Sequence, residues 1–220
     1  MLSVLSQAAR IALICVLFHL TVSLIAQEIQ HPPYGTDMTL QERSRGILGS
    51  PFLFDDFKKG ILIDNKGQEY QDIELNYDAL NHVMLSKKSE EVVMELNRYF
   101  YVKAVIDGEE YRNISPLGLP GYAMVIYDGE KIKCFERMES SQRPIKQKAL
   151  SQETASTQII NTHKYLLWHN DEIREVKKRG KDFYHIFTKT RVKNYIKEKS
   201  IKLKDDADFA RFLAHFESTL

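Results

Sequence analysis

Residues 99–114 read YFYVKAVIDGEEYRNI, and this stretch decides the fold class. Apolar residues stand at every second position from Phe100 to Ile106, which is the period of a β-strand with one buried face. An Asp-Gly pair at 107–108 is typical of a tight turn, and residues 111–114 lead back out of it. The pattern predicts a β-hairpin whose first strand runs over 99–106. The face predicted to be buried consists of Phe100, Val102, Ala104 and Ile106.

Similar segments, each bounded by turn residues, continue on both sides of this hairpin. They predict further strands at 59–63, 68–75, 82–86, 92–96, 122–127, 131–137, 159–169, 172–176 and 182–187. We therefore expect a mainly β fold with about nine or ten strands. The expected architecture is an antiparallel meander, forming a curled sheet or a partly open barrel.

The period of the apolar residues changes from two to 3.6 near the C-terminus, which predicts two short helices docked on the sheet. The first helix is expected over 189–199, and Asp205 is a candidate N-cap for the second. In the second helix, the apolar side chains recur with i, i+3, i+4, i+7 spacing. These are Phe209, Phe212, Leu213 and Phe216.

Composition divides the chain into four parts. Residues 1–26 are predicted to be a signal peptide and 27–48 an extended, polar lead-in. Residues 49–187 are predicted to be the antiparallel β domain, with a long polar loop at 138–158. Residues 188–220 form the helical pair that packs on the sheet.

The N-terminal segment carries an uncharged apolar run from Ile11 to Ala26, which follows Arg10. Sixteen residues are short for a bilayer span of about 30 Å, so the run predicts a secretory signal and not a membrane helix. We expect an exported protein of the periplasm or envelope that is not an integral membrane protein after cleavage. The alternative is an anchor formed by an uncleaved N-terminal segment.

The chemistry-bearing residues give no catalytic pattern. The chain has no G-x-S-x-G, P-loop, H-E-x-x-H or C-x-x-C motif. Cys134 is expected to be a buried, inert thiol. His163 and His169 are six residues apart on one predicted strand, about 20 Å, which is too far for both to bind one zinc ion. No cofactor and no metal are therefore expected.

The overall charge is balanced, with 31 Lys and Arg against 30 Asp and Glu. This balance gives no global electrostatic attraction to nucleic acid, so no nucleic-acid partner is expected. The densest basic run, KKRGK at 177–181, suits either a solvated turn or contact with anionic lipid headgroups or an acidic polymer. We expect the solvated turn.

Aromatic residues on the strands and on the last helix are the candidate partner-binding positions. A tyrosine side chain combines an apolar ring with a polar tip, which suits a binding face and equally suits a covered sheet surface. The phenylalanine stripe would be a docking patch only if the helix were not part of the core. The candidate residues are Tyr99, Tyr101, Phe209, Phe212 and Phe216.

Residues 49–87 carry short motifs that resemble a family of uncharacterised exported β-rich envelope proteins of Gram-negative bacteria. The motifs are Gly-Ser-Pro at 49–51, Phe-x-x-Gly at 57–60 and Leu-x-Tyr at 75–77. The C-terminal stretch VKNYIKEKSIKLKDDADFARFL is also similar, so the resemblance covers most of 49–220. It implies export and a β-rich fold, and it brings no activity and no site residues.

Two functions from different classes follow from these observations. The first is a non-catalytic envelope protein that binds a protein partner or a small apolar ligand through its sheet. The second is an exported hydrolase that works through paired carboxylates, such as a glycosidase. A concave apolar pocket would favour binding, whereas two carboxyl groups facing each other across a cleft would favour the enzyme.

Overall fold

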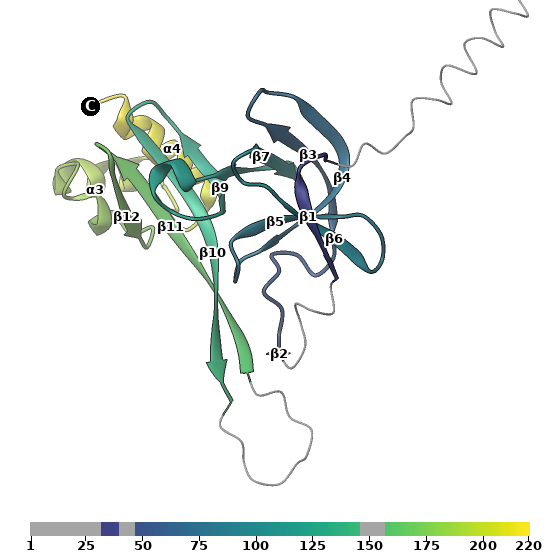
Figure 1. The fold of residues 1–220 in the computed structure, drawn as a ribbon. Helices are drawn as coiled ribbons and strands as arrows, with labels where there is room; N and C mark the ends of the chain where they lie inside the picture. The colour runs from purple at the N-terminus through teal and green to yellow at the C-terminus, as the bar shows by residue number, and fades with distance from the viewer. Residues whose placement is uncertain (1–31, 40–46, 146–156) are drawn as a thin grey trace, which may run out of the picture. The chain divides into compact units, whose positions relative to one another are not determined.

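The computed structural model describes residues 32–39, 47–145 and 157–220, and Pro32–Leu220 form one compact unit (Figure 1). The predicted signal peptide and residues 27–31 of the lead-in lie outside the described residues.

Within these ranges, eleven strands pair antiparallel in a single sheet, and the two-residue β2 pairs in parallel with β11. The strand order is β1-β6-β5-β4-β3-β7-β8-β9-β10-β11-β12, so β1 and β12 are edges and the sheet is not closed. The expected class, mainly antiparallel β with two C-terminal helices, is confirmed. The strands are β1 Gly35–Thr39, β2 Ile47–Leu48, β3 Lys58–Asp64, β4 Glu69–Asp78, β5 Val83–Lys87, β6 Val92–Leu96, β7 Tyr101–Ile106, β8 Glu109–Asn113, β9 Tyr122–Asp128, β10 Ile132–Pro144, β11 Thr157–His169 and β12 Glu172–Val176.

The sheet consists of two meanders that are joined side by side, because β3 of the first pairs with β7 of the second. One runs from β3 to β6, and the chain then returns so that β7 pairs with the other side of β3. The second meander continues from β7 to β12. The order of a simple meander is interrupted at the return from β6 to β7, and the lead-in strands β1 and β2 pair with β6 and β11.

The strand predicted to begin at Tyr99 begins instead at Tyr101. The backbone N–H groups of Phe100 and Tyr101 both bond to the carbonyl oxygen of Asn97, which places a turn before the strand. The pairing of β7 with β3 shifts register between Ile63 and Asp64. Because this irregularity interrupts the alternation, Tyr101 is buried with Ala104 and Ile106, and Val102 is exposed.

Two segments predicted to be irregular contribute strands. The polar stretch 138–158 is strand at both ends, because β10 extends to Pro144 and β11 begins at Thr157 in one continuous antiparallel ladder. Residues 146–156 lie outside the described residues. In the lead-in, β1 forms an edge strand on β6. The hydrogen bonds of the ladder join backbone groups, so a strand can form even where the side chains on both of its faces are polar. The polarity of these segments was therefore not sufficient to predict a loop.

The predicted last strand at 182–187 is a 3₁₀ turn, η2 Gly180–Phe183, followed by a coil. The Asp182 carboxylate accepts hydrogen bonds from the backbone N–H groups of Lys177 and Arg179, at 2.9 and 3.0 Å. These local bonds satisfy the backbone of a turn and compete with strand pairing. Phe183 is completely buried beneath this turn.

The two helices are α3 Lys189–Glu198 and α4 Asp206–Glu217. Asp205 caps α4 as expected, since its side chain accepts a hydrogen bond from the Asp208 N–H at 2.9 Å. Neither helix, nor any other helix in the described ranges, is long and apolar enough to cross a bilayer.

The α4 stripe is packed into a cluster with residues of β10, β11 and η2. Phe209, Phe212 and Phe216 have no exposed surface, and Cys134 on β10 is buried in the same cluster. The prediction of a buried thiol is confirmed, and burial raises the pKa of Cys134 far above its ordinary value, which keeps it as an unreactive thiol.

The end of α4 is tied to the β9–β10 turn by one carboxylate. Glu217 accepts hydrogen bonds from the Tyr127 hydroxyl at 2.5 Å and from the backbone N–H groups of Lys131 and Ile132 at 2.6 and 2.8 Å. Burial alone would raise the pKa of Glu217, but these hydrogen bonds offset that effect and lower the pKa below its ordinary value of 4.5.

We predict a pH-dependent effect of Glu217→Gln. At pH 7 the variant should be less stable by about 1–2 kcal/mol, because charge-assisted hydrogen bonds become neutral ones. A lowered pKa gives stability that is present above the unfolded-state pKa and is lost as the pH falls through the folded-state pKa. Urea unfolding of both proteins across pH 3–7 should therefore show the difference shrinking below pH 4.5. A difference that does not change with pH would contradict the assignment to the charged carboxylate.

Candidate functional site: an apolar pocket on the sheet

A row of directly opposed residues crosses four strands, and its members on β8, β9 and β10 line a pocket. Tyr111 on β8 is opposite Met124 on β9, Met124 is opposite Glu136 on β10, and Glu136 is opposite Tyr165 on β11. Directly opposed residues of an antiparallel sheet point to the same face, so the strand register places these side chains together. Met138 and His163 form the next opposed pair.

The pocket is small: its cavity volume is about 80 Å³, and about 380 Å³ when the open space at its mouth is included. Its wall is mostly aromatic and aliphatic, which is the usual composition of small-molecule sites. The residues that line it are Leu53, Tyr77, Tyr111, Tyr122, Ala123, Met124, Glu136, Met138 and His163.

The position of β10 explains why one acid stands in this apolar wall. Ile132 and Cys134 belong to the cluster under the helices, whereas Met138 belongs to the cluster of the first meander. Side chains two apart on a strand share a face, so Glu136 lies between the two apolar clusters. Its side chain is only 15% exposed.

Glu136 is paired with His163 at the mouth of the pocket. The imidazole Nδ1 lies 2.7 Å from the Glu136 Oε1, and the His163 side chain is 51% exposed. The carboxylate is therefore oriented by a partner that itself faces solvent. A ligand group that donates a hydrogen bond would find an oriented acceptor at this point.

The tyrosines around the pocket remain neutral. Burial, together with the carboxylates of Glu109 and Glu136, raises the pKa of Tyr111 to about 12. Burial likewise raises the pKa of Tyr77 to about 12. The Tyr122 hydroxyl donates to the Tyr101 carbonyl oxygen at 2.7 Å, and the Tyr77 hydroxyl lies 3.4 Å from the His82 Nδ1. The rings of Tyr77 and Tyr122 therefore line the pocket while their hydroxyl groups bond within the protein.

The five predicted partner-binding residues do not come together at this site. Tyr101 is completely buried, and so are the three phenylalanines of α4, Phe209, Phe212 and Phe216. A partner cannot contact these four side chains in this structure, so their assignment as contact residues is corrected: they are core residues. Tyr99 is 75% exposed, and it lies outside the lining of the pocket.

The pocket residues Glu136 and Met124 were not among the predicted site residues, and His163 was considered only as a metal ligand. A signal for them existed in the alternation of β10, where an acid interrupts the apolar face of Ile132, Cys134 and Met138. The sequence did not show which strands lie beside β10, and the pocket depends on those neighbours.

The other candidate chemistries are not assembled here. His169 and His185 line a separate polar hollow, and His163 lies in the apolar pocket. The described residues contain no group of three or more His, Cys, Asp or Glu side chains that could hold a metal ion. Glu136 is the single carboxylate in the pocket wall. On the opposite face of β10 and β11, an open groove is lined by three carboxylates, Glu139, Asp171 and Glu175, and Lys164 pairs with Glu139 and Glu175 at 2.7 and 3.6 Å.

No protein family, no curated protein and no solved structure matches this chain. The resemblance to exported β-rich envelope proteins therefore stays a prediction.

Proposed function

We propose that this protein is a non-catalytic binding protein that holds a small apolar ligand in the pocket lined by Tyr111, Met124 and Glu136. The observation that carries the proposal is an apolar hollow with one oriented carboxylate in its wall. The apolar wall supplies affinity through burial of ligand surface, and the Glu136–His163 pair orients one polar end of the ligand.

The same observation argues against the carboxylate-dependent hydrolase. A glycosidase uses two carboxyl groups on either side of the scissile bond. The pocket wall supplies one, and in the groove on the other face of β10 and β11 Glu139 and Glu175 both pair with Lys164, beside Asp171. We therefore place binding first.

We further propose that this binding takes place in the cell envelope after export. The support is the apolar run of residues 11–26 behind Arg10, which has the length of a secretory signal. A small apolar ligand is sparingly soluble in water, so a carrier with a partly open pocket suits an aqueous compartment between membranes.

The proposal predicts that narrowing the mouth of the pocket weakens apolar binding. Leu53 is half-buried at the wall, so Leu53→Trp places a larger side chain in the hollow. The probe is N-phenyl-1-naphthylamine, a neutral apolar dye whose fluorescence rises when it leaves water. Its titration should show saturable binding to the parent and about tenfold weaker binding to Leu53→Trp, which corresponds to a steric cost of about 1.4 kcal/mol.

Leu119→Trp is the matched control, because Leu119 is also a half-buried loop leucine but packs against a different apolar cluster. It should leave dye binding unchanged. Glu136→Gln should keep the dye, which has little polar surface, because the apolar wall is intact. If the parent does not bind the dye, or if both tryptophan variants bind it as the parent does, the pocket is not the ligand site.

A further inference from the structure

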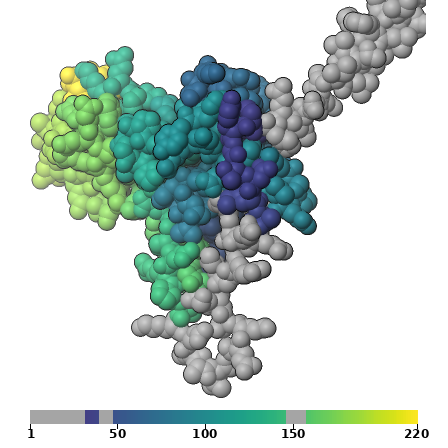
Figure 2. All heavy atoms as spheres, viewed as in Figure 1, coloured from purple at the N-terminus to yellow at the C-terminus, as the bar shows by residue number. Residues whose placement is uncertain are grey.

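Positive charge is concentrated in one segment of the chain. Residues 177–204 contain eleven Lys and Arg and two Asp and Glu, a net charge of +9 in a chain whose overall net charge is +1. Ten of these cations are exposed, and the exception is Lys178, which is buried over the Tyr165 ring. Figure 2 shows this segment, in the green to yellow-green colours, at the surface of the unit. The net charge of the whole chain is therefore close to zero although residues 177–204 form a strongly basic surface.

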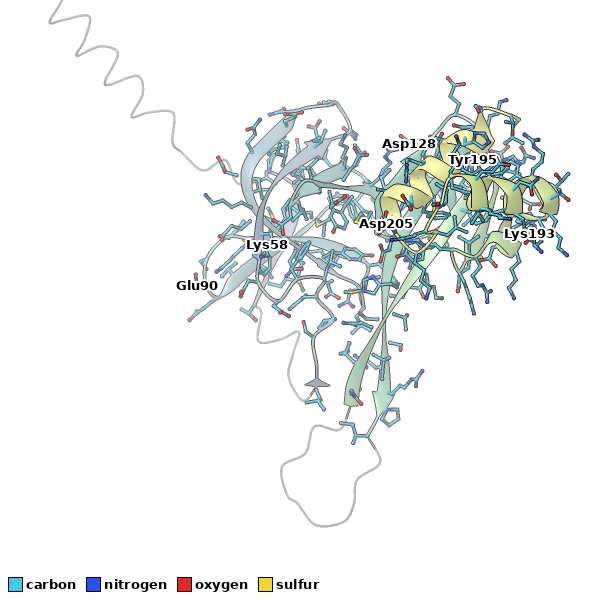
Figure 3. All side chains as sticks on the ribbon, turned by 180° about the vertical axis from the view of Figure 1, so that it is seen from behind. Lys58, Glu90, Asp128, Lys193, Tyr195 and Asp205 are labelled. Atoms are coloured by element: carbon cyan, nitrogen blue, oxygen red, sulfur yellow. The ribbon has the colours of Figure 1, made fainter. Side chains whose placement is uncertain are left out.

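The helix α3 presents three of these cations as a continuous stripe. Lys189, Lys193 and Lys197 follow each other at four-residue intervals, so they lie on one side of the helix. The apolar residues Val192 and Ile196 are centred about 80° around the helix from this stripe and belong to the cluster beneath α3. Figure 3 shows Lys193 on the outer side of α3. The stripe therefore faces solvent over the full length of the helix.

This charge is not neutralised by the protein itself. Elsewhere in the described ranges several half-buried cations are paired, for example Lys103 with Glu110 and Lys133 with Asp128. Within 177–204 only Lys178 and Arg179 have an ion-pair partner among the described residues. Like charges four residues apart destabilise a helix by a few tenths of a kcal/mol, so the stripe makes the fold slightly less stable.

We infer that this basic surface, formed by η2, α3 and the Lys199–Lys204 link, docks on an anionic lipid headgroup surface. Nine of the eleven cations are Lys, which binds as a point charge on a flexible stem and suits a fluid surface of phosphates. The large exposed aromatic residues of the described chain are Tyr34 and Tyr99, and neither lies in this segment. The tyrosines within the segment, Tyr184 and Tyr195, are half-buried, and the Tyr195 ring stacks on His215, so neither is a fully exposed platform of the kind that single-stranded nucleic acid uses.

The test compares the full chain with Lys189→Gln/Lys193→Gln/Lys197→Gln in vesicle co-sedimentation. The vesicles are phosphatidylcholine alone, and phosphatidylcholine with one-third phosphatidylglycerol. The readout is the ratio of binding to the two kinds of vesicle, since any affinity of the apolar run 11–26 for lipid is common to both. Three basic residues near an anionic surface should change that ratio by about 100-fold, and raising the salt concentration should reduce the parent's ratio.

The control variant Lys58→Gln/Lys59→Gln/Lys66→Gln removes the same net charge from β3 and its following turn. These lysines also have no ion-pair partner among the described residues, and β3 is distant from the helices in the sheet order. The control should keep the parent's ratio. Equal loss in both variants would show a general charge effect and overturn the proposal. The proposal would also be overturned if the parent protein did not bind anionic vesicles but bound duplex DNA through the α3 lysines. The surface would then be a nucleic-acid site.

Discussion

Phe212→Ala is expected to lower the free energy of unfolding by about 3–5 kcal/mol, because it removes a completely buried ring and leaves a cavity. The Phe212 ring centroid lies 5.0 Å from that of Phe183 and 4.7 Å from that of Phe216, so its neighbours belong to the turn before α3 and to α4 itself. A typical domain is stable by about 5–15 kcal/mol, so the loss is a large share of the total. Urea unfolding followed by circular dichroism measures it.

Tyr99→Ala is the control for this measurement. It also removes an aromatic ring, but Tyr99 is 75% exposed, and the cost should stay within about 0.5–1 kcal/mol. If Phe212→Ala unfolds at the same urea concentration as the parent, α4 does not contribute to the core in solution. The phenylalanine stripe would then be accessible, and its interpretation as a partner-binding patch, which requires a helix outside the core, would apply.

The burial of the α4 phenylalanines was predicted correctly and the burial of Tyr101 was not, and one physical difference between helices and strands explains both outcomes. A helix is built from contacts within one segment, so its spacing alone identified the buried face. A strand is completed by its neighbours, and an extra residue in the pairing changes which side chains are buried. In the pairing of β7 with β3 the extra residue is Val102, because Ile63 pairs with Lys103 and Asp64 pairs with Tyr101. The alternation in the β7 sequence does not reveal this bulge, so the burial of Tyr101 was not predicted.

The pocket was beyond prediction for the same reason. Its floor is a row across β8, β9 and β10, and only the register brings Tyr111, Met124 and Glu136 into line. The basic surface, in contrast, is nearly contiguous in sequence. The run at 177–181 was recognised as basic and interpreted as a solvated turn, because the structure of the following residues was needed to see that the α3 lysines continue it.

Gly121→Ala is expected to destabilise the protein by about 2–5 kcal/mol and to weaken binding in the pocket. Gly121 has a φ of +87°, a left-handed conformation that costs a residue with a side chain about 1–2 kcal/mol. A Cβ at this position would also lie 2.4 Å from the Tyr77 hydroxyl and 2.9 Å from the His82 Cβ. Such overpacking adds about 1–3 kcal/mol. Because Tyr77 lines the pocket, relief of the clash must displace part of the pocket wall.

Gly118→Ala separates the two contributions. Gly118 has nearly the same backbone conformation, with φ +84°, but a Cβ there would meet no atom within 4 Å. Gly118→Ala should therefore show the backbone cost of about 1–2 kcal/mol alone and should leave dye binding unchanged. The difference between the two variants measures the contact of residue 121 with Tyr77 and His82. If both variants lose the same stability and both bind N-phenyl-1-naphthylamine as the parent does, Gly121 is required only for the left-handed backbone and does not support the pocket wall.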